Sequence, residues 1–151
     1  MKKMLRFFVV SVLCTLWLSG LSFADESSIV GKWKTIDDKT NQPKAIVQIY
    51  EQDGKYFGKV VDLFRKPSEE QNPICDKCSD SDPRKDKPIR GMVILTDMEK
   101  DGDEYDDGDI LDTKDGSIYS CEMKIEDGKL QVRGYIGFSL FGRTQTWHRV
   151  E

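Results

Sequence analysis

Hydrophobic and polar residues alternate with a period of two along most of the chain after residue 28, as they do in strands with one buried face. Short runs rich in β-branched and aromatic residues carry this alternation, and four Asp-Gly pairs stand between them. Asp-Gly readily adopts the positive φ that a tight hairpin needs. We therefore expect strands at 29–36, 44–51, 55–64, 91–98, 108–113, 117–126, 129–136 and 143–150.

The pattern predicts an all-β fold, because no stretch beyond residue 24 has the period of an amphipathic helix. About eight short strands in one domain suit a small antiparallel up-and-down barrel. Alternation also assigns inward faces to two neighbouring strands, which should meet in the core. The expected inward residues are Tyr119, Cys121, Met123 and Ile125 on one strand, and Leu130, Val132, Gly134 and Ile136 on the next.

The first 24 residues have the features of a signal peptide. Three basic residues precede the apolar run 7–18, and a small-x-small cleavage site ends at Ala24. The apolar run is shorter than the roughly 18 residues that a membrane-spanning helix needs, and no later stretch approaches that length. We expect cleavage near Ala24, a periplasmic or secreted location without stable membrane insertion, and a single β-barrel domain at 25–151.

The net negative charge of the domain disfavours some classes of binding partner. Residues 25–151 hold 20 Lys and Arg against 27 Asp and Glu, a net charge of −7. Such a surface repels phosphate backbones and anionic membranes, and no basic patch is interleaved with aromatic residues. Nucleic acid is therefore not an expected partner.

A polar stretch at 65–88 interrupts the strands and contains Cys75 and Cys78. A structureless loop of this length is uncommon in a compact domain unless it is functional or pinned. A redox pair of the thioredoxin type would need a helix N-terminus, and a metal site would need two more ligands, with only Cys121 and His148 left. We favour a disulfide, either Cys75 with Cys78 or one of them with Cys121, and expect no metal and no cofactor.

The run 101–109 crowds six carboxylates into nine residues. A calcium loop beginning at Asp103 would place Tyr105 at its third position and Lys114 at its twelfth, where acidic ligands are needed. A solvated acidic turn is therefore the preferred interpretation. Catalytic signatures are also missing from the sequence, since His148 is the only histidine and no Gly-x-Ser-x-Gly motif occurs. We do not expect an enzyme.

Two resemblances bear on the fold. Gly31-Lys-Trp33 near the start, with Trp147 and Arg149 near the end, resembles the lipocalin-like calycin barrels, in which an early tryptophan packs against a late arginine at the barrel base. A second set of motifs extends over nearly the whole of 25–151, namely Thr35-Ile-Asp-Asp38, Lys44-Ala-Ile-Val47, Ile49-Tyr-Glu51, Cys75-Asp-Lys-Cys78, Gly91-Met92, Ile110-Leu-Asp112, Arg133-Gly-Tyr-Ile-Gly-Phe-Ser-Leu140 and Gly142-Arg-Thr-Gln-Thr-Trp147. With these motifs the chain resembles the exported bacterial family called domain of unknown function 2147. This resemblance implies a lipocalin-like barrel and no catalytic residues.

The connection 137–142 is the most suggestive feature for binding, because its apolar side chains must either cap the barrel or form a lip at its mouth. We expect a non-enzymatic barrel that binds a small apolar or amphipathic ligand. The alternative is a structural or protein-interaction domain with a filled barrel and the 65–88 loop as its contact surface. The candidate ligand-binding residues are Trp33, Tyr119, Phe138, Phe141 and Trp147, with Arg143 or Arg149 available to pair with a ligand carboxylate.

Overall fold

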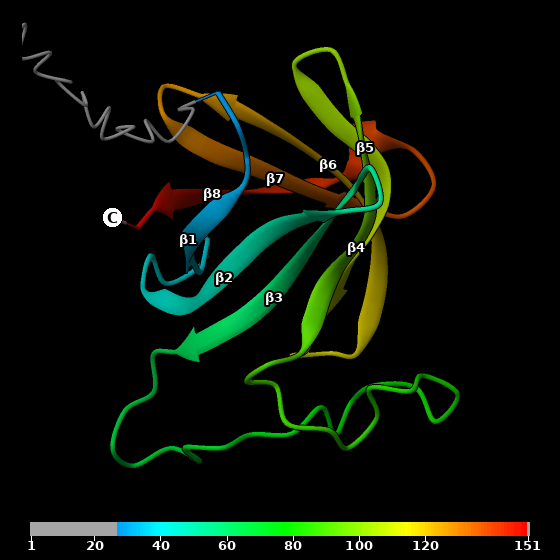
Figure 1. Ribbon diagram of the computed structural model, residues 1–151. Coiled ribbons are helices and arrows are strands. Elements are labelled where there is room, and N and C mark those ends of the chain that lie inside the picture. The colour runs from blue at the N-terminus through cyan, green and yellow to red at the C-terminus, as the bar shows by residue number, and fades with distance from the viewer. Residues whose placement is uncertain (1–26, 151) are drawn as a thin grey trace, which may run out of the picture.

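The computed structural model describes residues 27–150, which form a closed antiparallel barrel of eight strands (Figure 1). The elements are β1 (Gly31–Ile36), β2 (Pro43–Gln52), β3 (Lys55–Leu63), β4 (Val93–Asp101), β5 (Glu104–Asp112), β6 (Ser117–Glu126), β7 (Lys129–Tyr135), the short 3-10 helix η1 (Ser139–Phe141) and β8 (Arg143–Arg149). Each strand pairs with the next, and β8 returns to pair with β1. The predicted up-and-down barrel is thus confirmed. The signal peptide predicted at 1–24 lies outside the described residues.

Tight turns fix the register of the barrel. In the β2–β3 hairpin both Asp53 and Gly54 have positive φ, at 53° and 77°, which is the backbone of a type I′ turn. The β6–β7 turn at Asp127 and Gly128 has the same geometry, with φ of 51° and 70°. Both turns are among the Asp-Gly hairpins that the sequence predicts.

Two of the predictions on strand bounds need correction. The run 101–109 is not a turn, because β4 continues to Asp101 and β5 begins at Glu104, leaving only two residues between them. In β5, Glu104, Asp107 and Asp109 are exposed, whereas Tyr105 and Gly108 are buried, and a bulge between Tyr105 and Gly108 accounts for the odd spacing of the buried positions. Ile136 is also not an inward residue. It follows the end of β7 at Tyr135, and Ile136 is exposed.

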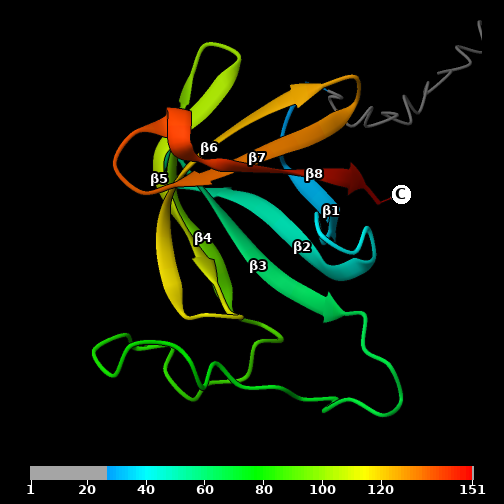
Figure 2. The same ribbon diagram turned by 180° about the vertical axis from the view of Figure 1, so that it is seen from behind.

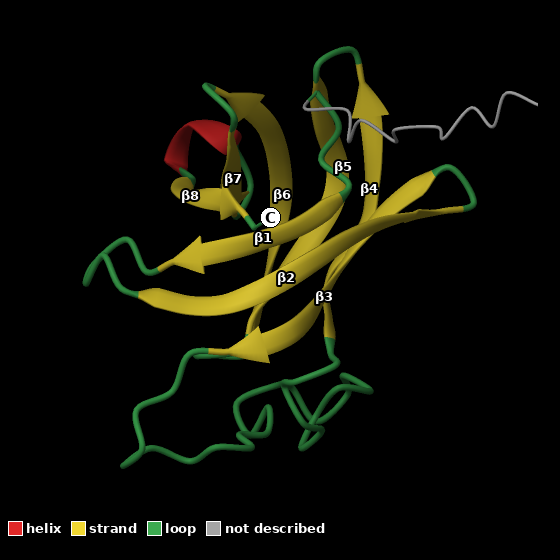
Figure 3. Cartoon of the chain, turned by 60° about the vertical axis from the view of Figure 1, so that its left-hand side comes forward, coloured by secondary structure: helices red, strands yellow, loops and turns green. Residues whose placement is uncertain are grey.

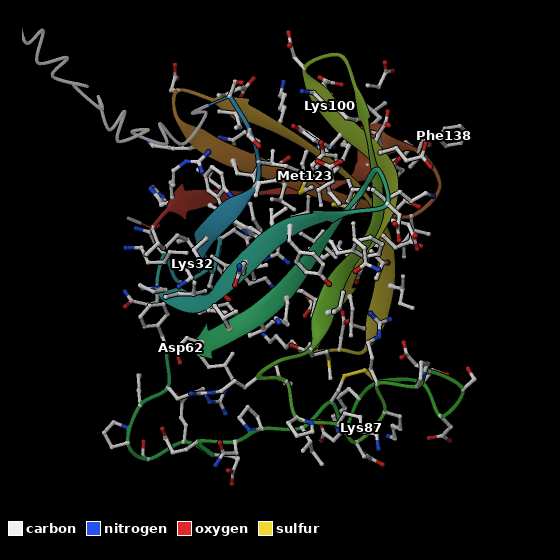
Figure 4. The ribbon with its side chains drawn as sticks, viewed as in Figure 1. Lys32, Asp62, Lys87, Lys100, Met123 and Phe138 are labelled. Carbon is white, nitrogen blue, oxygen red and sulfur yellow. A yellow bond between two sulfur atoms is a disulfide. The ribbon has the colours of Figure 1, made fainter. Side chains whose placement is uncertain are left out.

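The inward faces of β6 and β7 meet as expected. Met123 pairs with Val132, and Ile125 pairs with Leu130. Met123, Val132 and Leu130 are buried in one core cluster. Figure 4 shows Met123 within the barrel. The end of the barrel bounded by the β2–β3, β4–β5 and β6–β7 turns holds the buried Met98, Met123 and Leu130 of this cluster, and we call it the closed end.

The closed end is sealed where β1 and β8 pair, as the view from behind shows (Figure 2). Trp33 is fully buried, and the guanidinium carbon of Arg149 lies 4.3 Å from the centroid of its ring. The indole Nε1 donates to the carbonyl of Ile29 at 2.7 Å. Arg149 donates to the carbonyls of Ser28 and Val30 at 2.6 and 3.2 Å. The expected packing of an early tryptophan on a late arginine is therefore present.

The opposite, open end is bounded by the β1–β2 turn, the β5–β6 turn, the β7–β8 connection and a long loop at 64–92 between β3 and β4. This loop runs beneath the strands rather than away from them (Figures 1 and 3). It has internal hydrogen bonds, and Ile74 pairs with Pro88 as an isolated bridge. Within residues 27–150, no helix has the length and apolar character that a membrane crossing needs.

Candidate functional site

A cavity of about 1120 Å³ occupies the open end of the barrel, between the core and loop 64–92. Its inner wall is apolar. Val47, Val60, Val132 and Trp147 belong to the buried core and also form the cavity wall. From the side of the loop, Ile89 also lines the cavity. A hollow of this kind beneath a long connection is the arrangement in which small barrels hold ligands.

Gly134 helps to create this space. It occupies an inward position on β7, where the neighbouring inward residue is the buried Val132. A Cβ atom added at Gly134 would lie 3.4 Å from Cβ of Tyr119 and 3.5 Å from Cγ2 of Ile110, which are ordinary contacts. The backbone at Gly134 does not need positive φ. A larger residue is therefore excluded neither by strain nor by a clash at Cβ, and its side chain would extend into the cavity.

The mouth of the cavity is polar and charged. Among its described lining residues six are Lys or Arg and five are Asp or Glu. Arg143, at the start of β8, forms two hydrogen bonds and an ion pair with Asp38 of the β1–β2 turn. The guanidinium of Arg143 holds the pKa of the Asp38 carboxyl below its usual range. This pair joins the β1–β2 turn to the start of β8, the strand that neighbours β1 in the barrel.

The disulfide closes a short ring within loop 64–92, and this ring packs against the barrel. Cys75 is bonded to Cys78, and both are buried, with 0% and 3% of their surface exposed. They pack with Met92 and Leu111 in a small second core cluster beside the cavity. In Figure 4 the sulfur–sulfur bond lies between the loop and the end of the barrel. This decides between the two expected pairings in favour of Cys75–Cys78.

The disulfide closes residues 75–78 into a short ring, which we call the cystine ring. The backbone of the β5–β6 turn contacts the backbone of this ring. A Cβ atom at Gly116 would lie 1.8 Å from the carbonyl oxygen of Lys77, and Gly116 has φ of 76°. A side chain at this position is therefore excluded twice, by the backbone conformation and by the approach of the loop. The contact holds residues 75–78 close to the rim of the barrel.

A second attachment lies further along the loop. Arg84 donates to both carboxylate oxygens of Asp82, at 2.9 and 2.7 Å, and to the carbonyl of Val93 at 3.2 Å. The guanidinium lowers the pKa of Asp82, whose side chain is largely buried. Loop 64–92 is thus tied to β4 by an arginine as well as to β5 by the cystine.

The candidate residues from the sequence fall into three groups. Tyr119, Arg143 and Trp147 line the cavity. Trp33 and Arg149 lie at the closed end, where they contact each other.

The third group comprises Phe138 and Phe141 of the β7–β8 connection. The two residues are 77% and 79% exposed and do not line the cavity. Figure 4 shows Phe138 projecting outward. The segment neither caps the barrel nor forms an inner lip. Arg133 instead holds its backbone, donating to the carbonyls of Ser139 and Leu140 at 2.7 and 3.2 Å.

Loop 64–92 and the lysines at the mouth contribute to the cavity lining, and neither contribution is predicted by the sequence pattern. Ile89 lies just beyond the polar stretch 65–88, whose composition suggested a solvated loop rather than a cover. Lys66 and Lys114 stand in turns where nothing in the alternation marks a binding residue. Only the length of the loop and its two cysteines signalled that it was held in place.

No other centre with recognisable chemistry is apparent in residues 27–150. No group of three or more His, Cys, Asp or Glu side chains in this range could hold a metal ion. Cys121 is a free thiol inside the core, and burial raises its pKa, so it is protonated at neutral pH. A smaller hollow of about 310 Å³ lies on the outer surface, between residues of β5 to β8 such as Glu122 and Gln131.

Comparisons with known proteins agree with this architecture. Residues 31–149 match the family described as "Uncharacterized protein conserved in bacteria (DUF2147)". No curated protein matches the chain. A solved structure from the human pathogen Helicobacter pylori, described as a protein that belongs to the lipocalin family, superposes with a TM-score of 0.68 at 20% identity, covering 82% of this chain and 84% of that one. At this identity the likeness concerns the fold alone. The chain belongs to the DUF2147 family, and its barrel is lipocalin-like.

Proposed function

We propose that this protein binds a small apolar or amphipathic ligand inside its barrel and is a binding protein rather than an enzyme. One observation carries the proposal, namely the cavity of about 1120 Å³ with an apolar inner wall beneath loop 64–92. Small-molecule sites are typically cavities of roughly 300–1,000 Å³ with apolar walls and a few polar groups. The lipocalin-like barrel suggests ligand binding in general, which supports the same conclusion.

Export is part of the proposal. The signal peptide expected at 1–24 would deliver the domain to an oxidising compartment, and the Cys75–Cys78 disulfide is stable in such a compartment. There the protein would take up an apolar molecule that is poorly soluble in water.

Filling the cavity tests the proposal. Gly134→Leu places an apolar side chain in the cavity, while Ser120→Leu adds the same group on the exposed outer face of β6. The neutral fluorescent probe N-phenyl-1-naphthylamine should bind the wild-type protein and Ser120→Leu equally. We expect its Kd to rise at least about tenfold in Gly134→Leu, which corresponds to a loss of about 1.4 kcal/mol of binding free energy.

Native mass spectrometry of gently purified protein gives the second readout. A retained ligand would appear as extra mass on the wild-type protein and disappear from Gly134→Leu. If the probe binds neither protein, or binds both with the same Kd, the cavity is not a ligand site and the proposal is wrong.

A further inference from the structure

The charges at the cavity mouth are not all equally engaged, and this difference bears on which ligand the cavity would take. The chain as a whole has four more acidic than basic residues, yet the described lining has six basic against five acidic residues. Base-rich surroundings in an acidic protein favour an anion near the mouth. The short-range contacts of each group decide how strongly.

The carboxylates of the lining already have partners among nearby residues of the chain. Asp37 accepts two backbone N–H groups, each at 2.9 Å, and Asp115 accepts one at 2.8 Å. Asp112 and Glu69 each accept one backbone N–H, at 2.9 and 2.6 Å. Asp76 lies 3.5 Å from the ammonium of a neighbouring lysine. Their charges are thus partly compensated by backbone dipoles or by a cation.

Two cations of the lining have no such compensation. The ammonium groups of Lys66 and Lys114 form neither a hydrogen bond nor an ion pair with any residue of 27–150. Their backbones are nevertheless fixed, because the N–H of Lys66 donates to Glu69 and that of Lys114 to Asp112. Lys66 follows β3 and Lys114 lies in the β5–β6 turn, so the two approach the mouth from different elements.

The arginines expected to pair with a ligand carboxylate are less available. Arg149 lies at the closed end against Trp33 and donates to two backbone carbonyls. Arg143 does line the cavity, but both of its hydrogen bonds go to the carboxylate of Asp38. A ligand would have to break this pair to use Arg143, whereas it could approach the lysines directly.

We propose that the ligand is an amphipathic anion, with its apolar tail against the inner wall and its acidic head group at the mouth beside Lys66 and Lys114. This inference rests on the proposed function, since it specifies the ligand class of the same cavity. It assigns ligand contacts to two lysines that no sequence motif marks.

The structure also limits the size of the effect. Both lysines are exposed, so the head group keeps part of its water and each pair is screened by salt. Exposed ion pairs contribute typically about 0.2–1 kcal/mol each, so two of them favour an anion over a neutral analogue by roughly two- to thirtyfold in Kd.

Two ligands that differ only in the head group test this directly. Dodecanoate and dodecanol are each titrated at low ionic strength, by displacement of N-phenyl-1-naphthylamine, into the full chain. Wild-type protein should bind dodecanoate about tenfold more tightly than dodecanol. The double variant Lys66→Gln/Lys114→Gln should bind the two equally and leave the Kd of dodecanol unchanged.

A matched control removes the same charge elsewhere. Lys59→Gln/Lys129→Gln replaces two exposed lysines that do not line the cavity, so its preference for dodecanoate should equal that of the wild type. Added salt should weaken the preference in the wild type and in the control alike.

The outcomes separate this inference from the proposed function. If both ligands bind with equal affinity, the cavity binds apolar molecules without selecting anions, and only the inference is overturned. The same holds if the control loses as much preference as the double variant at the mouth. If neither ligand binds, the proposed function fails and the inference fails with it.

Discussion

Gly116→Ala should detach the cystine ring from the β5–β6 turn and so loosen the cover of the cavity. The new Cβ atom would stand 1.8 Å from the carbonyl oxygen of Lys77 and 2.3 Å from its carbon, distances that no packed atoms adopt. Because both partners belong to rigid backbone, no side-chain rotation can relieve the overlap. Either the turn or the ring at 75–78 must move.

The energetic cost has two parts. The first is the positive φ of 76°, which costs an alanine about 1–2 kcal/mol relative to glycine. The second is the loss of packing in the small core of Cys75, Cys78, Met92 and Leu111. This cost is largest if the cystine ring separates completely from the barrel. Exposing two large apolar side chains costs about 1.5–3 kcal/mol each, so the second part is at most about 6 kcal/mol.

Gly54→Ala serves as the control, because it has the backbone cost without the contact with the cystine ring. Gly54 also follows an aspartate in a hairpin turn and has φ of 77°, but a Cβ atom there would meet nothing within 4 Å. The backbone cost should therefore be the same in both variants. Any further loss of stability in Gly116→Ala measures the contact with the cystine ring.

Two assays read the result. Urea unfolding should show Gly116→Ala to be less stable than Gly54→Ala by about 1–3 kcal/mol, because partial movement of the ring relieves the clash before the whole cluster is lost. Dithiothreitol should reduce the buried Cys75–Cys78 bond several-fold faster in Gly116→Ala. Equal stability and equal reduction rates in the two variants would refute the idea that this contact holds loop 64–92 in place.

Three further predictions concern other parts of the barrel. Trp33→Ala should cost about 3–5 kcal/mol in urea unfolding and Arg149→Ala less, and their losses should not add, since each breaks the same contact; strict additivity would contradict this. Asp38→Asn should destabilise the protein at pH 7 but not near pH 2. The pKa of Asp38 is lowered by Arg143, so this stabilisation is complete above the unfolded pKa of about 3.9 and is lost as pH falls through the folded value; a difference independent of pH would contradict it. Phe138→Ser should leave the midpoint of thermal unfolding within about 2 °C of the wild type, because the ring is 77% exposed, whereas a large drop would mean that it caps the core.

The sequence predicts the local features of this fold well because each depends on near neighbours. Asp-Gly pairs set the hairpins through backbone conformation, and alternation sets the buried faces of β6 and β7. The pairing of Trp33 with Arg149 came from a resemblance rather than from alternation, and the structure confirms it. In β5 the strand predicted at 108–113 begins earlier, and the polar composition concealed residues 104–107, because three of these four residues carry a carboxylate and only Tyr105 is buried.

The candidate site could be predicted only in part. Trp147 and Tyr119 face the cavity because they lie at inward positions of strands. The course of loop 64–92 depends instead on contacts between distant segments, such as Gly116 with Lys77, and local patterns carry no information about these. The same reason explains why Phe138 could not be placed, since an apolar connection can cap a barrel or project from it.

The two ends of the barrel divide stability and binding between them. At the closed end Trp33, Met98, Met123 and Leu130 are buried together in the core cluster, and burial of apolar surface of this kind stabilises a small domain. The open end can remain hollow, because loop 64–92 is held over it by the packing of the cystine on Leu111, by the hydrogen bonds of Arg84 and by the backbone contact at Gly116 rather than by a filled core. None of these attachments involves Gly134, so a side chain added there would change the shape of the cavity wall without removing what holds the loop in place.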